Sequence, residues 1–249
     1  MRIVVAIDSM KGCLSSADAN RAAADGVRNV FPHADIVQIP VSDGGEGFID
    51  AFQAAIGGTL QKVTVRDPMM RYITAKYLLR DQEAVIEMAQ ASGLTLLAEE
   101  ERNPMVATSY GTGQLIADAV RKGAKRMIVG LGGSATSDAG IGMLRALIDA
   151  FAKHGQFDDI AELHDVRFTI ASDVKNPLCG AQGAAHVFAP QKGASPEMAE
   201  RLDARARKFA EVSAKHFGYD CSNDEGAGAA GGLGYAFQRQ GDTFASWFL

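Results

Sequence analysis

Five polar, glycine-rich segments carry most of the side chains that could do chemistry in this 249-residue chain. Carboxylates, lysines and hydroxyls recur in them, and most of them directly follow a run of residues typical of a strand. The five segments are residues 8–16, 40–47, 130–140, 172–194 and 226–232. In open α/β sheets, ligands bind in the crevice at the carboxyl ends of the strands. The spacing therefore predicts one ligand cleft assembled from several loops.

The first two segments each place an acid at the end of an expected strand. Asp8 can act as a base or a metal ligand, and Lys11 can neutralise a phosphate or a carboxylate. In the second segment, Asp43 precedes three glycines in four positions, which free the backbone to approach a small ligand. The alternatives are a plain strand-to-helix turn for the first segment, and an Asp-Gly turn with Glu46 as a helix-dipole partner for the second.

The third segment combines glycines and hydroxyls with the start of an expected helix. Backbone N–H groups in such a loop, together with a helix N-terminus, form an anion nest. Asp138 beside a bound phosphate would hold Mg²⁺ or accept a proton. The alternative is a tight loop with a capped helix, but the density of glycines and hydroxyls favours phosphate contact.

The last two segments are less specific. Asp173 again follows an expected strand, whereas Lys192 lies in a later turn, where an isolated lysine is more often a solvated surface residue. Residues 226–232 match G-x-G-x-x-G, but no strand precedes them and no acid follows about 20 residues later, so we reject a dinucleotide fingerprint. Tight packing through small residues and a backbone-lined ligand wall both stay open.

Composition excludes several classes of protein. The 25 Lys+Arg and 30 Asp+Glu residues give a net charge of −5 without a basic face, which argues against nucleic acid and a membrane surface as partners. No run is apolar enough for a signal sequence or a membrane span. Three widely spaced cysteines indicate neither a disulfide framework nor a metal clip, so we expect a reducing cytoplasm. The Walker A, H-E-x-x-H and G-x-S-x-G motifs are absent.

The elements that must position these loops alternate between strand and helix. The fold class expected is α/β, and the run of residues 3–7 predicts a strand buried on both faces of a parallel sheet. The expected strands are residues 3–7, 36–41, 63–65, 73–79, 84–88, 126–129 and 167–171. One expected helix begins at residue 15, and the others cover residues 48–56, 113–122, 139–151 and 196–216. The closely spaced strands from residue 63 to residue 88 favour antiparallel or mixed pairing.

A domain boundary is predicted near Arg66, where the rhythm of the elements changes. Two strand–helix units cannot make a stable doubly wound domain alone, because a two-stranded sheet is marginal. The first domain therefore needs more strands than residues 1–65 supply, and the irregular segment after Gly234 is too short to return them.

Seven motifs in order along residues 1–235 resemble the type 1 bacterial glycerate kinases. The motifs lie at residues 8–15, 42–47, 108–113, 132–138, 173–178, 191–194 and 226–232. The resemblance implies ATP-dependent, Mg²⁺-assisted phosphorylation of D-glycerate at the 2-hydroxyl. It also implies a flavodoxin-like domain, here incomplete and begun by residues 1–65, and a mixed-sheet α/β domain at residues 66–249 that carries the phosphate loops. The family's C-terminal Thr-Gly-Glu-Gly-Arg-x-Asp segment has no counterpart in this sequence.

Site roles follow from this resemblance combined with the chemistry of each residue. The expected catalytic residues are Asp8, Lys11, Asp43 and Lys192. The expected substrate-binding residues are Ser9, Gly44, Gly45, Glu46, Arg66 and Asn176. The expected nucleotide-binding residues are Gly132, Gly133, Ser134, Thr136, Gly226, Gly228 and Gly231, and the expected metal ligands are Asp138 and Asp173.

Three alternatives remain at this point. The chain could be a shortened, non-catalytic remnant that binds a ligand or a partner chain. It could instead phosphorylate another small hydroxy acid or a sugar, because residues 130–135 faintly resemble the phosphate loop of galactokinase-like enzymes. A homodimer or a separate completing chain could supply the strands that the first domain needs.

Overall fold

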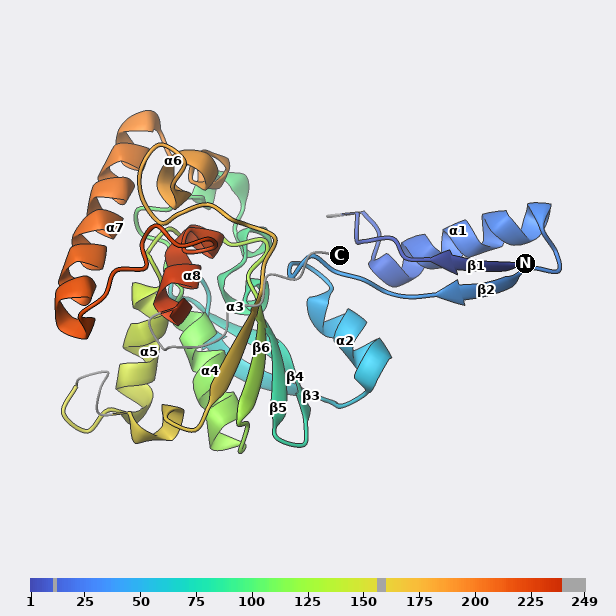
Figure 1. Ribbon diagram of the computed structural model, residues 1–249, viewed down its shortest axis with the longest axis horizontal. Helices are drawn as coiled ribbons and strands as arrows, with labels where there is room; N and C mark the ends of the chain where they lie inside the picture. The colour runs from blue at the N-terminus through green and yellow to red at the C-terminus, as the bar shows by residue number, and fades with distance from the viewer. Residues whose placement is uncertain (11–12, 156–159, 239–249) are drawn as a thin grey trace.

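The computed structural model describes residues 1–10, 13–155 and 160–238, and it is an α/β structure with two separate sheets (Figure 1). A two-stranded sheet has the order β1-β2, and a five-stranded sheet has the order β3-β4-β5-β6-β7. The strands are β1 Arg2–Val5, β2 Asp35–Gln38, β3 Thr59–Arg66, β4 Tyr72–Arg80, β5 Glu83–Glu87, β6 Arg126–Gly130 and β7 Arg167–Ala171. The helices are α1 Ser16–Val30, α2 Phe48–Ile56, α3 Ala89–Ser92, α4 Tyr110–Arg121, α5 Ile141–Phe151, α6 Ala184–Phe188, α7 Pro196–Phe217 and α8 Ala229–Gln238.

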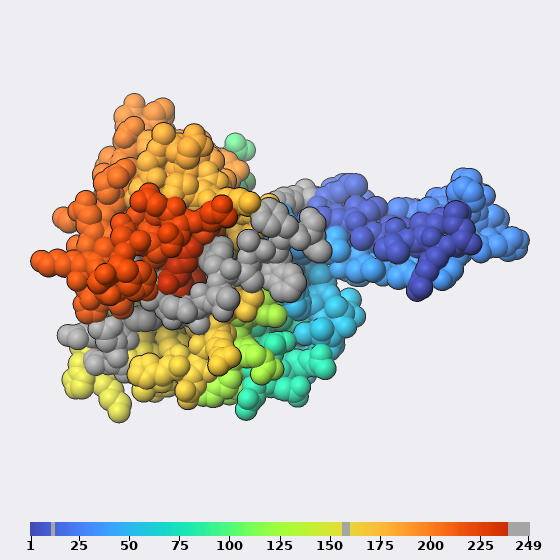
Figure 2. All heavy atoms as spheres, viewed as in Figure 1, coloured from blue at the N-terminus to red at the C-terminus, as the bar shows by residue number. Residues whose placement is uncertain are grey.

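The small sheet and its helix protrude from the rest of the molecule (Figure 2). Strands β1 and β2 pair in parallel, and Ser15 caps α1 by accepting the Asp18 N–H, as its sequence predicts. One prediction for β1 is wrong: Val5 is buried, but Val4 is 59% exposed. The reason is that α1 covers only one face of a sheet of two strands, so the apolar run is buried on one side alone.

Two buried polar side chains of α1 hold the chain where it leaves the small sheet. Asn20 accepts the Ile7 N–H at 2.8 Å and donates to the Ile39 carbonyl at 2.9 Å. The Ser16 hydroxyl donates to the Ile7 carbonyl at 2.7 Å and accepts the Val41 N–H at 3.0 Å. These contacts fix the starts of the two loops that carry Asp8 and Asp43.

The large sheet is mixed, as the strand spacing predicts. Its first two strand pairs are antiparallel, and the β5–β6 and β6–β7 pairs are parallel. Helices α4, α5 and α8 cover one face, where Leu115, Met143 and Phe237 belong to the main apolar core (Figure 1). Helix α2 covers part of the other face, where Phe48 and Ile49 pack with Leu78, Val85 and Ala171.

The expected domain boundary between residues 65 and 66 stays a prediction. Two elements that precede it, α2 and β3, pack with the large sheet that follows it. Strand β3, which ends at Arg66, pairs along its whole length with β4. Helix α2 also packs on the large sheet. Residues 48–65 therefore associate with the mixed sheet, because their apolar side chains find their partners there.

Membrane insertion through a helix has no support in the described part of the chain. None of the helices there combines the length and the apolar character that crossing a bilayer requires.

Candidate active site

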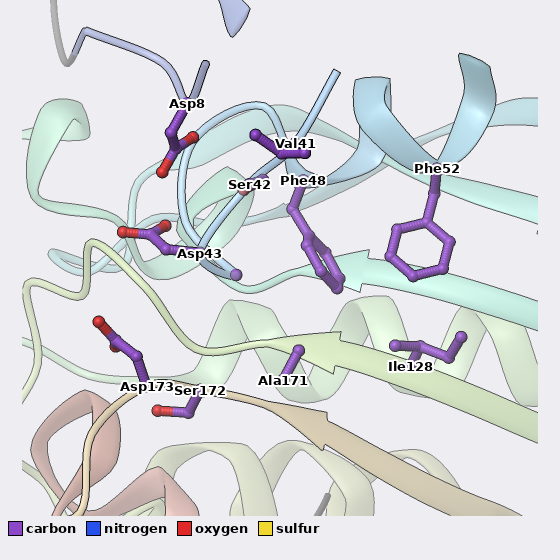
Figure 3. Close-up of a pocket in the computed structure, with 11 residues that line it drawn as sticks. Asp8, Val41, Ser42, Asp43, Phe48, Phe52, Ile128, Ala171, Ser172 and Asp173 are labelled. Atoms are coloured by element: carbon purple, nitrogen blue, oxygen red, sulfur yellow. The ribbon is translucent and has the colours of Figure 1, made fainter. Parts of the chain in front are cut away.

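A cavity of about 500 Å³ lies where loops from both sheets meet (Figure 3). Three carboxylates, those of Asp8, Asp43 and Asp173, face one another around one end of it. The Phe48, Phe52 and Ile128 side chains line the other end, the first two from α2 and the third from β6. The remaining lining residues are Val41, Ser42, Gly44, Ala171 and Ser172. The structure therefore brings together three of the acids that the sequence singles out.

Contacts within and between the first two loops orient their acids. The Asp8 carboxylate accepts the Ser9 N–H at 2.6 Å, and the Asp43 carboxylate accepts the Gly45 N–H at 2.9 Å. The Ser9 hydroxyl donates to the Glu46 carbonyl at 3.3 Å, which links the two loops. Ser9 and Glu46 thus contact each other beside the cavity. Lys11, the expected cation of the first loop, lies outside the described residues.

The second loop touches the glycine-rich loop after β6 backbone to backbone. The Gly132 N–H donates to the Gly44 carbonyl at 3.0 Å. A Cβ atom on Gly132 would lie 2.5 Å from the Gly45 Cα, and one on Gly44 would lie 2.6 Å from the Ala171 carbonyl oxygen. Gly44 also has a left-handed φ of 93°. These contacts show that the glycines admit another loop, and their predicted contact with a ligand stays a prediction.

Lys192 lies beneath the glycine-rich loop and is 2% exposed, which excludes the alternative of a solvated surface lysine and leaves its expected catalytic role a prediction. Its Nζ donates to the Ser134 hydroxyl at 2.7 Å and to the Thr136 carbonyl at 2.6 Å. It follows the short helix α6, in a 3₁₀ turn over Pro190–Lys192, and is not among the residues that line the cavity. Burial lowers its pKa to about 7, against the opposing effect of the Asp138 charge.

The depressed pKa of Lys192 predicts that the stability of the protein depends on pH. Below about pH 7 the amine is charged in both states, whereas from there to 10.5, its ordinary pKa, the unfolded chain binds a proton that the folded chain lacks. The free energy of unfolding should therefore rise with pH across this window. Urea denaturation of the wild type and Lys192→Met, near pH 6.5 and near pH 9.5, isolates this effect. An equal pH dependence in both proteins would contradict it.

Asp138 is not among the residues that line the cavity, and its side chain joins two helix starts. Its carboxylate accepts the backbone N–H groups of Ser109, Gly140 and Gly142 at 2.8 to 3.1 Å. It also accepts the Ser109 hydroxyl at 2.9 Å. These bonds satisfy N–H groups at the starts of α4 and α5, where a carboxylate is stabilising. Asp138, an expected metal ligand, therefore stabilises two helix starts, and its role toward a metal stays a prediction. Asp173, the other expected metal ligand, lines the cavity.

Arg66 and Asn176, two further predicted substrate-binding residues, contact residues near them in the sequence. The Arg66 guanidinium lies 3.5 Å from the centre of the Tyr72 ring and donates to the Met70 carbonyl. The Asn176 amide donates to the Gln182 carbonyl at 2.8 Å. Neither lines the cavity, so the structure does not bring these two residues to the three carboxylates.

The segment of residues 226–232 packs against two of the other loops. Ala230, Gly231 and Gly232 have consecutive left-handed conformations, and the Gly231 carbonyl accepts the Ala139 N–H at 3.0 Å. A Cβ on Gly231 would lie 1.9 Å from the Thr136 carbonyl oxygen, and one on Gly228 would lie 2.3 Å from that of Pro177. Tight packing through small residues is confirmed here, and nucleotide binding by this segment stays a prediction.

Sequence reasoning missed the segment from Glu87 to Leu94. Glu87 ends β5 and is 2% exposed, and the residues after it pack along the glycine-rich loop. The available signal is the one that singles out Asp8 and Asp43: an acid at the end of an apolar run, here residues 84–88.

The charges of the cavity limit what it can bind unaided. Within residues 1–10, 13–155 and 160–238, its lining contains carboxylates but no lysine, arginine or histidine. In that same part of the chain, no three His, Cys, Asp or Glu side chains gather closely enough to hold a metal ion alone. Among these described residues, the charge at the carboxylate end of the cavity is therefore negative.

Comparison with known proteins identifies relatives along nearly the whole sequence. The sequence profile described as "Glycerate kinase family" matches residues 3–244. The "Glycerate 2-kinase" of Escherichia coli K12 is 42% identical and the "Glycerate kinase" of Bacillus subtilis 168 is 41% identical, each over 95% of this chain and 67% of the relative. A crystal structure assigned to glycerate kinase 2 of Salmonella typhimurium LT2 superposes with a TM-score of 0.82 at 37% identity, covering 99% of this chain and 71% of that one. The chain thus spans about two thirds of the length of these curated relatives.

Proposed function

The chain belongs to the glycerate kinase family, and from that premise we propose that it transfers the terminal phosphoryl group of ATP to the 2-hydroxyl of D-glycerate with Mg²⁺. The observation that carries the proposal is that the Asp8 and Asp43 loops meet at one cavity while the Asp43 loop packs backbone to backbone on the glycine-rich loop after β6. Phosphoryl transfer depends mainly on positioning and on neutralising charge; these loops would supply the positioning, and a cation held by the acids would supply the charge.

Asp43 is the proposed proton acceptor for the attacking hydroxyl. Its carboxylate lies in the cavity and is oriented by the Gly45 N–H. The close packing of Gly44 and Gly45 on Gly130 and Gly132 fixes it relative to the glycine-rich loop. Asp8 lines the same end of the cavity and is the alternative acceptor.

The glycine-rich loop is the proposed phosphate site. Gly133 has a left-handed φ of 73°, and the atom nearest to a Cβ placed there is 3.7 Å away, so a phosphate oxygen can approach its backbone. Lys192 supports this loop from beneath through Ser134 and the Thr136 carbonyl. In this proposal Lys192 therefore acts by positioning the loop.

The acids of the cavity fit a magnesium ion that arrives with the nucleotide. Mg²⁺ prefers oxygen ligands and is usually held by one or two carboxylates together with substrate phosphates. Asp173 would hold it, with Asp43 or Asp8 close by. When bound, the ion supplies positive charge to the phosphates, which the described lining of the cavity lacks.

We also propose that a further polypeptide segment covers the open face of the small sheet. The strands β1 and β2 leave Val4 59% exposed, and a two-stranded sheet is marginal alone. A second copy or a separate completing chain would cover this face. Native mass spectrometry that finds only monomers would argue against a second copy.

We place the protein in the cytoplasm, where both proposed substrates would be available.

A coupled assay of ATP consumption with D-glycerate tests the proposed activity. We expect turnover that requires D-glycerate and Mg²⁺, with L-glycerate and simple sugars as controls for acceptor specificity. Phosphorus NMR of the product should show 2-phosphoglycerate. ATP and glycerate binding without turnover would instead favour the non-catalytic alternative, and turnover with a sugar would favour another small-molecule kinase.

A further inference from the structure

Glu87 is a buried acid at the same edge of the large sheet as the cavity, and neither the sequence motifs nor the proposed mechanism uses it. It is the last residue of β5 and pairs in register with Gly130, the last residue of β6. Gly130 in turn contacts the Asp43 loop, because a Cβ placed there would lie 2.4 Å from the Gly44 carbonyl oxygen. Glu87 therefore lies next to the contact between the two candidate loops.

Both carboxylate oxygens of Glu87 accept hydrogen bonds. Oε2 accepts the Ile49 N–H at 3.3 Å, and Oε1 accepts the Gln90 side-chain amide at 3.1 Å. The ionised carboxylate accepts both bonds without rearrangement. Burial raises the pKa of Glu87 above its ordinary value and the Asp50 charge raises it further, against the lowering by these two hydrogen bonds and the Lys76 charge.

The Ile49 contact replaces a cap that α2 does not supply itself. The residue at its N-cap is Gly47, which has no side chain to accept an N–H group. Free N–H groups at a helix start are stabilised by an acceptor, and a carboxylate adds a favourable interaction with the helix dipole. Because α2 begins directly after residues 43–47, Glu87 fixes the end of the loop that carries Asp43.

The residues after Glu87 hold the glycine-rich loop. The Met88 N–H donates to the Gly130 carbonyl at 3.1 Å, and the Leu94 N–H donates to the Gly133 carbonyl at 2.8 Å. The Ala135 N–H donates to the Ser92 carbonyl at 2.9 Å. Residues 87–94 thus bind one loop through a carboxylate and the other through backbone groups.

We propose that Glu87 is a positioning residue: its carboxylate, by holding the start of α2, sets the place of Asp43 relative to the glycine-rich loop. The part of this inference that concerns turnover rests on the proposed function. The part that concerns the order of the Asp43 loop does not, and it can be measured without substrate.

The test compares Glu87→Met with Glu83→Met, a matched change at the other end of the same strand. The Glu83 carboxylate is partly exposed and pairs with Arg126, away from the cavity. A methionine at position 87 has a similar length but no acceptor oxygen, so the hydrogen bonds from Ile49 and Gln90 are both lost. Hydrogen exchange of the backbone amides of residues 43–50, the melting temperature, and the kcat and KM values for glycerate and ATP are measured for both variants.

We expect Glu87→Met to speed amide exchange across residues 43–50 by about tenfold and to leave β3 and β4 unchanged. Its kcat should fall by about 10- to 100-fold with the KM for ATP within about twofold, because a small displacement of the acceptor affects the reaction more than nucleotide binding. Glu83→Met should change none of these values by more than about twofold.

Exchange across residues 43–50 that is the same in both variants would overturn the inference, whether or not the wild type turns over. Faster exchange over the entire large sheet would also overturn it, because Glu87 would then only stabilise the fold. A wild type without turnover would refute the proposed function and leave the exchange comparison to decide the role of Glu87.

Discussion

Asp43→Asn is expected to lower kcat for glycerate phosphorylation by about 100- to 10,000-fold, the usual contribution of a positioned general base. The amide keeps the size of the side chain and an oxygen for the Gly45 N–H, so the loop should hold its shape. It cannot accept a proton at neutral pH. Steady-state kinetics with saturating ATP and D-glycerate measure the effect, and the melting temperature should change by no more than a few degrees.

Two companion variants make this result specific to Asp43. Asp50→Asn changes an exposed acid of the adjacent helix that pairs with Lys76, and it should leave kcat within about twofold. Asp8→Asn tests the competing acceptor at the same end of the cavity. A larger loss of kcat in Asp8→Asn than in Asp43→Asn would transfer the role to Asp8, and unchanged kcat in Asp43→Asn would exclude Asp43.

Periodicity and strand-end acids predicted much of what surrounds the cavity. Helix α2 and strand β7 have the bounds that the apolar patterns predicted. Asp8 and Asp43 meet at one cavity because they follow the parallel strands β1 and β2, whose carboxyl ends share an edge. Asp173 follows β7 of the other sheet, so its arrival at the same cavity depends on how the loops of the two sheets pack.

Predictions that depended on long-range packing did less well. Nothing local to Lys192 indicates that it is buried beneath a loop more than 50 residues earlier. The glycines at positions 44 and 132 predicted a close approach but could not specify the partner, and each proves to contact the other's loop. The apolar run of β1 predicts burial, but only the number of neighbouring strands decides whether one face or both are covered.

The contact between these two loops predicts that Gly132→Ala should lower kcat by about 100-fold. A Cβ at position 132 would lie 2.5 Å from the Gly45 Cα and 2.6 Å from the Gly45 nitrogen, both of which are backbone atoms. The two loops must therefore separate, and a misplacement of about 1 Å between reacting groups can cost about 100-fold in rate. Steady-state kinetics and urea denaturation measure the two effects, with an expected destabilisation of about 1–3 kcal/mol.

Gly26→Ala is the matched control for this substitution, because no atom beyond the local backbone of α1 lies within 4 Å of a Cβ at that position. Alanine there should leave kcat unchanged and stabilise the protein by about 0.5–1 kcal/mol, since glycine is a poor helix former. If Gly132→Ala retained wild-type kcat, the rigid contact of the two loops would be unnecessary for phosphoryl transfer. If it lost stability without a matching loss of kcat, Gly132 would serve the fold alone. If kcat instead falls by more than the fraction of folded protein does, the loss lies in the reaction itself. The two backbones must then stay in contact while Asp43 accepts the proton.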